Sequence, residues 1–356
     1  MSPAGRSGYP SPGGRGWLSL TSALATLIVI AVLAVVAGLI AYKAPGPPAR
    51  AGAQTTVILR KGAGVSEIAA DLQRAGVVRS APFFMAAAQL TGAAHALKAG
   101  EYAFPSRASL SAVIRKMRRG EVVHHRITIP EGLTSQQAVD ILMKSPVLTG
   151  TVSPPPEGTL LPETYEVVRG ESRAAVLQRM EDARDRLVSQ LWAKRRPGLP
   201  YTSVDQAITL ASIVEKETAL PAERPKVAAV YLNRLRQGMK LDSDPTVIYG
   251  ITQGAPLGHG LRASELQNTS PYNTYLNPGL PPGPIGNPGR ASLAAVMDPA
   301  QTDELYFVAN GTGGHSFSRT LEEQAKNVAK WREIEKQRKD AAILAGPPIP
   351  PPSEHR

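Results

Sequence analysis

SVDQAITLASIVEKETAL, residues 203–220, is the stretch that organises the second half of this 356-residue chain. Ser203 is a residue type that caps helix N-termini, and Leu210 and Val214 recur at helical spacing on one apolar face. The stretch therefore predicts a helix with a buried face that begins after Ser203 and ends in two glutamates. These two carboxylates are the first candidates for chemistry in the sequence.

The two glutamates, Glu215 and Glu217, point roughly 160° apart around a helix, because each residue turns the chain by about 100°. They are therefore not able to act together on one bond. Each lies at an edge of the apolar face, where partial burial would raise a carboxyl pKa and favour the protonated form that a general acid needs. Alternatively, both are ordinary boundary residues paired with Lys216 or Arg224. Helical geometry alone leaves these readings open.

Composition excludes several classes of site. The chain has no cysteine, which rules out disulfides, thiolate metal sites and thiol nucleophiles. Its six histidines show no metal-ligand spacing, so we predict no metal and no other cofactor. A net charge of +11 favours an anionic partner, but no nucleic-acid-binding signature accompanies the charge, and nucleic acid is not predicted as a partner.

Residues 17–42, WLSLTSALATLIVIAVLAVVAGLIAY, carry no charge and exceed the roughly 20 residues that cross a bilayer as a helix. Trp17 and Tyr42 stand at the ends as interfacial anchors do, and the apolar run is longer than that of a signal peptide. We therefore predict a retained, single-pass transmembrane helix. Flanking positive charges are nearly balanced, so the charge rule does not give the orientation. A short tail before a large C-terminal region favours translocation of the bulk, and a cytoplasmic enzyme tethered to the membrane is the alternative.

Two segments read as a strand, a glycine turn and a helix. The first, at 55–78, follows a Pro/Gly linker at 43–54 and places Ile68 on an apolar helix face. The second, at 126–148, has Thr134 as the N-cap of its helix. Together they indicate a small α+β region that resembles the LysM-type modules that bind bacterial wall glycans, and a spacer domain is the plain alternative.

Helical periodicity dominates the chain from residue 174. One helix is predicted near 174–195, another near 225–239, and the aromatic and β-branched run at 304–310 predicts a strand. The predicted fold class is α+β, with mixed helices and strands in the last folded domain. The predicted order is a disordered cytoplasmic tail (1–16), a transmembrane helix (17–42), a linker (43–54), a LysM-like membrane-proximal region (55–150), a catalytic domain (151–335) and a Pro-rich disordered tail (336–356).

Polar and aromatic residues concentrate in predicted loops that follow the two glutamates. These loops are LDSDPTVIYG at 241–250, SPYNTY at 270–275, GLPPGPIGNPG at 279–289 and GGHSFS at 313–318. Aromatic faces cover sugar rings, and amide and carboxylate groups bond sugar hydroxyls, so rigid loops of this composition are typical of a saccharide cleft.

LASIVEKET, LNRL, SDPTVIYG, YNTY, GLPPGPIGNPG, YFVA and GGHSFS, in this order after an apolar helix, resemble the endolytic murein transglycosylases, or YceG-like family. The resemblance covers roughly residues 55–335. GTLLPETYEV at 158–167 also matches, with Leu161 where the family usually has an aromatic residue.

The resemblance implies that Glu217 is the catalytic glutamate, with Glu215 as the reserve candidate, and that Glu217-Thr218 is similar to the Glu-Ser pair of lysozyme-like lytic transglycosylases. It implies a membrane-anchored lyase that cleaves the bond between N-acetylmuramic acid (MurNAc) and N-acetylglucosamine (GlcNAc) in nascent peptidoglycan. The expected products end in 1,6-anhydro-MurNAc, and cleavage would terminate glycan elongation. The residues expected to hold the sugars are Glu163, Thr218, Asp244, Tyr272, Asn273, Tyr275, His315 and Ser318.

The resemblance also implies a location and partners. The location is the bacterial inner membrane, with the catalytic domain on the periplasmic or extracytoplasmic side. The partners are peptidoglycan strands, together with peptidoglycan synthases and proteins of the divisome or elongasome. Two other classes of function stay open from the residues alone: a non-enzymatic peptidoglycan-binding scaffold of the synthesis or division machinery, and a basic, membrane-tethered nucleic-acid binder.

Overall fold

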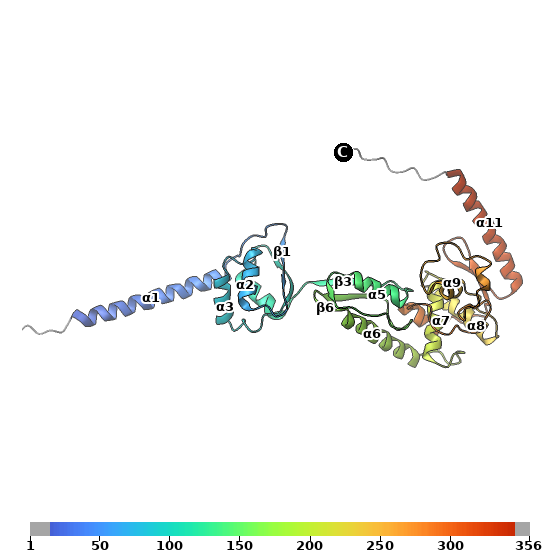
Figure 1. The fold of residues 1–356 in the computed structure, drawn as a ribbon, viewed down its shortest axis with the longest axis horizontal. Helices are drawn as coiled ribbons and strands as arrows, with labels where there is room; N and C mark the ends of the chain where they lie inside the picture. Colours follow the sequence, from blue (N-terminus) through green and yellow to red (C-terminus); the bar gives the residue numbers. More distant parts are fainter. Residues whose placement is uncertain (1–14, 346–356) are drawn as a thin grey trace, which may run out of the picture. The chain divides into compact units, whose positions relative to one another are not determined.

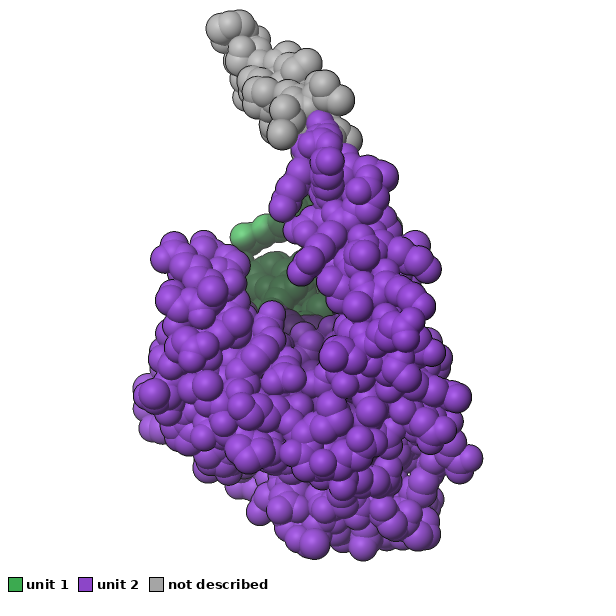
Figure 2. All heavy atoms as spheres, turned by 90° about the vertical axis from the view of Figure 1, so that its right-hand side faces the viewer, with its two compact units in different colours: residues 1–124 green, residues 125–356 purple. Residues whose placement is uncertain are grey.

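The computed structural model describes the backbone of residues 15–345 and the side chains of residues 22–340. It divides the chain into two compact units, residues 1–124 and 125–356 (Figures 1 and 2). The division falls earlier than the boundary near residue 150 that the sequence suggested. The second strand-turn-helix segment therefore belongs to the second unit and not to the first.

The first unit begins with helix α1 (Arg15–Lys43), which includes the predicted span 17–42. Its stretch Ser22–Lys43 is long and apolar enough to cross a membrane, and none of it is buried inside protein. Large aliphatic side chains such as Leu33 and Ile40 are more than half exposed along it. Such a surface is that of a membrane anchor or a signal sequence and not that of a core helix.

The remainder of the first unit is a small α+β fold. Its strands are β1 (Gln54–Leu59) and β2 (Gly100–Pro105), and its helices are α2 (Val65–Arg74), α3 (Ala81–Leu90) and α4 (Leu110–Arg119). The two strands pair antiparallel, with Val57 opposite Tyr102. Both side chains are buried, together with the predicted helix face at Ile68. The strand and helix predicted near the start of this unit are confirmed.

Residues 44–49, here called the strap, join α1 to this fold. The strap contains no helix or strand and is held in place by hydrogen bonds. Gly46 N donates to Arg107 O at 3.1 Å, and Arg107 N donates back to Pro47 O at 3.0 Å. Tyr42, at the end of α1, packs against the core of the unit. The end of the apolar helix is therefore fixed to the folded unit.

The second unit opens with two short strand pairs and two helices. Its first elements are β3 (His124–Thr128), α5 (Ser135–Lys144), β4 (Leu148–Thr149), β5 (Thr164–Val168), β6 (Glu171–Ser172) and α6 (Arg173–Ala193). Strand β3 pairs with β5, and β4 pairs in parallel with β6. Thr134 caps α5 in a reciprocal capping box with Gln137, so the predicted N-cap is confirmed.

Helix α7 (Val204–Glu217) is the central element of the second unit. Ser203 caps it as predicted, since its hydroxyl accepts a hydrogen bond from Gln206 N at 3.2 Å. Every residue from Ala207 to Val214 is buried, so the helix is covered on all sides and not on one face only. It packs between helices α8 (Arg224–Arg236) and α10 (Arg290–Met297).

Two predicted loops form regular elements instead. Most of LDSDPTVIYG is helix α9 (Asp244–Thr252), because Ser243 precedes a Pro at the second helical position and the Val/Ile/Tyr run packs on the core. HSFS of GGHSFS is strand β8 (His315–Ser318), which pairs antiparallel with β7 (Tyr306–Ala309). The predicted strand at 304–310 is confirmed as β7.

The remaining elements complete the second unit. They are the short helix η1 (Glu265–Gln267) and the last helix α11 (Leu321–Ala345). Helix α11 extends into the region 336–356 that was predicted to be a disordered tail. The rest of that tail and nearly all of the predicted tail 1–16 lie outside the described residues. The mixed helix and strand content agrees with the predicted α+β class.

Candidate active site

Glu217 is the last residue of α7, and its carboxyl group is held by two hydroxyls. Tyr231 OH, from α8, and Ser243 Oγ, from the N-cap of α9, each donate to Glu217 Oε1 at 2.6 Å. Both donor residues are buried, so each is fixed by packing before it meets the carboxyl group. Three helices thus define the position of one oxygen atom.

The surroundings of Glu217 favour its protonated form. Burial raises the pKa of the carboxyl group above its ordinary value, and the negative charge of Asp244 acts in the same direction. The hydrogen bonds from Ser243 and Tyr231 and the nearby His315 lower the pKa, but burial is the largest cause. Because both hydroxyls use Oε1, neither occupies Oε2, which is the oxygen on which a proton can reside and be transferred.

Glu215, the other candidate, has a different environment. Its side chain is only 4% exposed, and Oε1 accepts from Arg224 Nη2 at 2.8 Å. Oε2 accepts from Gly289 N at 2.8 Å, and the same Arg224 nitrogen reaches Glu131 Oε2 at 3.1 Å. A carboxylate with both oxygens engaged by an arginine and a backbone amide has the character of a structural ion pair. The pairing with Arg224 considered from the sequence is present for Glu215.

A second network begins at Thr218, immediately after Glu217. Thr218 Oγ1 donates to Glu223 Oε2 at 3.1 Å, and His315 donates to Glu223 through both its backbone N and its ring Nδ1, each at 2.8 Å. Burial acts to raise the pKa of Glu223, but the hydrogen bonds from His315 and Thr218 outweigh it and the pKa is lowered. Because an ionised Glu223 can only accept, the ring Nδ1 of His315 carries the hydrogen of this bond.

Asp244 and Tyr275 interact electrostatically with Glu217. Tyr275 OH donates to Asp244 Oδ1 at 2.6 Å. Burial raises the pKa of Tyr275, and its hydrogen bond to Asp244 and the charge of Glu217 add to that rise. Tyr272 packs against Tyr249 of α9, with ring centroids 4.9 Å apart. The structure therefore brings Asp244, Tyr275 and His315 into the electrostatic neighbourhood of Glu217.

Three predicted sugar contacts have other partners. Asn273 is 0% exposed, and its Nδ2 donates to Leu266 O at 2.9 Å and Asn268 O at 2.7 Å, so it organises its own loop. Ser318 is buried and donates to Gln324 Oε1 at 2.7 Å.

Glu163 precedes β5 and accepts from Arg290 Nη2 at 2.7 Å. Arg290 follows Gly289, whose amide bonds Glu215, so Glu163 is connected to the Glu215 ion pair. Its contacts do not include the hydroxyls that hold Glu217.

Sequence reasoning missed three residues of this site: Tyr231, Ser243 and Glu223. Tyr231 lies within the helix predicted near 225–239, and the available signal was that a buried tyrosine needs a partner for its hydroxyl. Ser243 lies within the quoted motif SDPTVIYG. Glu223 stands just before α8 in no quoted motif, and only the fold brings it to His315.

Within the residues that the structure describes, no three His, Cys, Asp or Glu side chains are grouped so that they could hold an ion. The chemistry available to this site is proton transfer by a buried carboxyl group, supported by hydroxyl donors and bordered by tyrosines, a carboxylate and a histidine.

Comparison with known proteins places the chain in a family. The YceG-like family profile matches residues 57–330. The chain is 30% identical to an endolytic murein transglycosylase of Bacillus subtilis, over 80% of this chain and 87% of that protein. It is 27% identical to an endolytic murein transglycosylase of Streptococcus pneumoniae, over 77% of this chain and 58% of that protein.

A solved structure is also similar to this chain. It is the crystal structure of a YceG-like protein from Listeria monocytogenes, at 30% identity, a TM-score of 0.49, and coverage of 77% of this chain and 98% of that one. The family profile extends over both folded units, from β1 to the first turns of α11. This chain therefore belongs to the YceG-like family.

Proposed function

We propose that this protein is a lytic transglycosylase that cleaves the MurNAc–GlcNAc bond of peptidoglycan, with Glu217 as its catalytic acid and base. One observation carries the proposal: a buried carboxyl group with a raised pKa has both hydroxyl donors on one oxygen and leaves the other for proton transfer. The relatives named endolytic murein transglycosylase support the same reaction and an endolytic mode of cleavage.

The reaction needs one carboxyl group in two successive steps. Protonated Glu217 gives its proton to the glycosidic oxygen as the bond from that oxygen to the MurNAc C1 breaks. The resulting carboxylate then takes the proton of the MurNAc C6 hydroxyl, whose oxygen forms the new bond to C1. The product is a 1,6-anhydro-MurNAc end, no water is consumed, and Glu217 regains its proton.

The two hydroxyl donors suit this alternation. Tyr231 and Ser243 stabilise the carboxylate that exists between the two steps, because a hydrogen bond to an ionised acceptor is stronger than one to a neutral acceptor. Burial stabilises the protonated state that begins and ends the cycle. The opposing effects keep the two states close in free energy, as a group that both donates and accepts a proton requires.

The other predicted residues take two kinds of role in this proposal. Asp244, Tyr275 and His315 interact with Glu217 or with its neighbours and would contact sugars, as would Tyr272. The buried Thr218 would act by holding Glu223. Three others would act through the loops and strands that they hold: Glu163, Asn273 and Ser318.

The proposal includes a membrane anchor and a cellular location. Helix α1 is proposed to span the inner membrane once, with both folded units on the extracytoplasmic side, where nascent peptidoglycan lies. The first unit is proposed to be LysM-like, supported by its two antiparallel strands with helices α2 and α3 between them. In this arrangement, wall-synthesis proteins are the expected neighbours, and cleavage would end the growth of a strand.

The test is mass spectrometry of the products formed from purified peptidoglycan. The full chain is expected to release strands that end in 1,6-anhydro-MurNAc, and Glu217→Gln is expected to lose about 10²–10⁴-fold or more of that activity. Glu322→Gln, at an exposed position of α11, is the matched control and should be fully active.

Each contrary outcome has a distinct meaning. Reducing ends in place of anhydro ends would show a hydrolase and overturn the transglycosylase mechanism. Unchanged cleavage by Glu217→Gln would remove Glu217 from the catalytic role. Binding of glycan without cleavage by the unaltered chain would instead support the peptidoglycan-binding scaffold.

A further inference from the structure

Helix α3 (Ala81–Leu90) is unusual for a surface helix, because it is apolar on both sides. Its sequence, APFFMAAAQL, contains no charged residue. Phe84, Ala87 and Ala88 form its buried face. The opposite side exposes Pro82, Phe83, Ala86 and Leu90, which follow one stripe at helical spacing, and Gln89 is the one polar side chain exposed beside them. Leu90 is 89% exposed, a degree of exposure that water does not favour for leucine.

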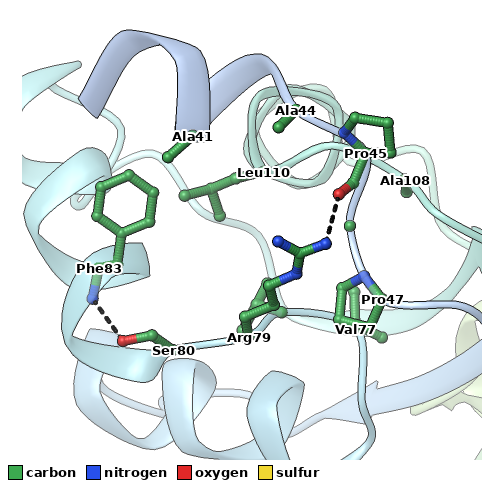
Figure 3. Close-up of a pocket in the computed structure, with 12 residues that line it drawn as sticks. Ala41, Ala44, Pro45, Pro47, Val77, Arg79, Ser80, Phe83, Ala108 and Leu110 are labelled. Atoms are coloured by element: carbon green, nitrogen blue, oxygen red, sulfur yellow. Dashed lines mark hydrogen bonds between the residues drawn. The ribbon is translucent and has the colours of Figure 1, made fainter. Parts of the chain in front are cut away.

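The exposed stripe of α3 begins beside the end of helix α1. Ala41 and Ala44, in the last turn of α1 and just after it, line the same pocket of about 100 Å³ as Phe83 and Leu110. Figure 3 shows the Phe83 ring below Ala41, with Leu110 between them and the strap. The apolar surface of α1 therefore meets that of α3 at this pocket, where Arg79 and Ser80 are the charged and polar side chains of the lining.

Several contacts fix the position of α3 beside the end of α1. The Arg79 guanidinium, just before α3, donates to Pro45 O of the strap at 3.2 Å (Figure 3). Ser80 caps α3 by accepting from Phe83 N at 3.3 Å. Tyr42 packs into the core of the same unit. The first turn of α3 is thus tied to the end of α1 from both sides of the pocket.

The depth of α3 relative to the bilayer follows from how far the apolar surface of α1 extends along that helix. Leu39 and Ile40 are 57% and 64% exposed, so hydrocarbon is expected to cover α1 up to this level when it crosses a bilayer. A side chain beside Ala41 then lies at the boundary between acyl chains and headgroups. Lys43 and Arg79 are exposed at the same level, where basic side chains meet lipid phosphates.

We propose that α3 is an interfacial helix, which inserts its stripe Phe83, Ala86 and Leu90 among the lipids of the bilayer that α1 crosses. The proposal rests on the proposed anchoring by α1. The occupant of the apolar stripe is lipid because the stripe meets a surface that only lipid can cover over its length, and because the flanking charges are positive. The first unit then contacts the membrane through two helices, α1 and α3, instead of through α1 alone.

The chain suits a direct test because it contains no cysteine. Single variants of the full chain, Leu90→Cys, Leu33→Cys and Thr56→Cys, would each carry an environment-sensitive fluorophore and be reconstituted into vesicles of phosphatidylethanolamine and phosphatidylglycerol. Leu33 lies in the middle of α1, and Thr56 is an exposed residue of β1, which lies on the far side of the unit from α1 (Figure 1). Quenchers attached to the upper acyl chain and a water-soluble quencher are then compared at each position.

The expected pattern is that probes at positions 33 and 90 lose most of their emission to the lipid-attached quencher, whereas the probe at 56 responds to the aqueous quencher. A probe at 33 in lipid with a probe at 90 in water would overturn the interfacial role of α3 and leave the anchor intact. A probe at 33 in water would overturn the anchoring and the inference together.

One further outcome and one further variant complete the test. A probe at 90 that is shielded from both quenchers would show that a second copy of the chain covers the stripe, which would also overturn the proposal. Ala86→Cys provides a second position on the same stripe and is expected to repeat the result at 90, so that a local effect of one label does not decide the outcome.

Discussion

Tyr231 of α8 donates its hydroxyl hydrogen to Glu217 Oε1, the final residue of α7, across 2.6 Å. The tyrosine ring is itself fixed, because it is buried and meets Phe307 of β7 edge-on with centroids 5.8 Å apart. The position of the proposed catalytic carboxyl group is therefore determined by the packing of two helices against a hairpin, and not by a flexible loop.

Tyr231→Phe is expected to shift the pH profile of cleavage. The tyrosine hydroxyl lowers the pKa of Glu217, so its removal should raise that pKa further. Because the first step needs the protonated acid, activity falls as pH rises through this pKa, and the descending limb of kcat/KM should move upward by about one pH unit or more. The measurement is kcat/KM on a defined glycan from pH 4 to pH 9.

A matched control for Tyr231→Phe is Tyr201→Phe. Tyr201 is also buried and donates to a core carbonyl, that of Val296, with no contact to Glu217. Its loss should lower thermal stability without moving the pH profile. Equal shifts in the two variants would show that the effect comes from general loosening of the core and not from the Glu217 hydrogen bond.

Glu217→Gln is expected to change how stability depends on pH. The folded-state pKa of Glu217 is raised above 4.5, so between that value and the folded-state pKa the folded chain holds more protons than the unfolded chain. The contribution of Glu217 to the unfolding free energy therefore decreases as pH rises through this window, at about 1.4 kcal/mol per unit of pKa shift in total. Glutamine does not titrate, so the variant keeps the same unfolding free energy contribution at this position as pH rises.

Chemical denaturation at pH 4, 6 and 8 measures the effect. The variant should match the unaltered chain at pH 4 and become progressively more stable than it at higher pH. A constant difference between the two proteins across this range would contradict a raised pKa at Glu217.

Arg224→Met is expected to destabilise the second unit strongly. It leaves the carboxylate of Glu215, which is only 4% exposed, without its guanidinium partner, and breaking a buried pair costs about 3–5 kcal/mol. Adding Glu215→Gln should restore part of that loss, since no unpaired charge then stays buried. Urea unfolding of both single variants and the double variant gives the coupling energy, and strictly additive effects would show that the two groups do not depend on each other.

Gly46→Ala is expected to loosen the strap. A Cβ on Gly46 would lie 2.2 Å from Ala108 O, a backbone atom that has no room to move aside, so the cost should be about 1–3 kcal/mol. Gly64→Ala is the matched control, because its Cβ would meet nothing closer than Ser66 Oγ at 3.9 Å. Thermal unfolding of both variants in detergent checks the difference, and equal melting temperatures would mean that the strap does not stabilise the unit.

Local patterns in the sequence predicted the elements that depend on local physics. Ser203 and Thr134 are N-caps because each hydroxyl needs only the amide three residues ahead. The apolar helix at 17–42 and the strand at 304–310 follow from composition alone. The helix α9 was missed because its polar, proline-containing start resembles a turn, and only its packing on the core favours the helix.

The site could be predicted only in part, because its decisive contacts join distant segments. Glu215 and Glu217 have the same local sequence signal, and it is the position of Arg224 and of Tyr231 after folding that distinguishes them. Asn273 illustrates the converse: its residue type suggested a sugar contact, whereas its side-chain amide holds its own loop through the carbonyls of Leu266 and Asn268. The residue type predicts which interactions a side chain can make, and the fold determines which of them it makes.

The position of Glu217 at the C-terminal end of α7 has an additional consequence. The aligned peptide groups of a helix place partial negative charge at this end, so a glutamate there is disfavoured when ionised by about 0.3–1 kcal/mol, and more where solvent is excluded. A protein selected for stability alone would place a lysine at this point. Here the backbone itself helps the carboxyl group to retain its proton, and no side-chain substitution can remove that contribution while the helix persists.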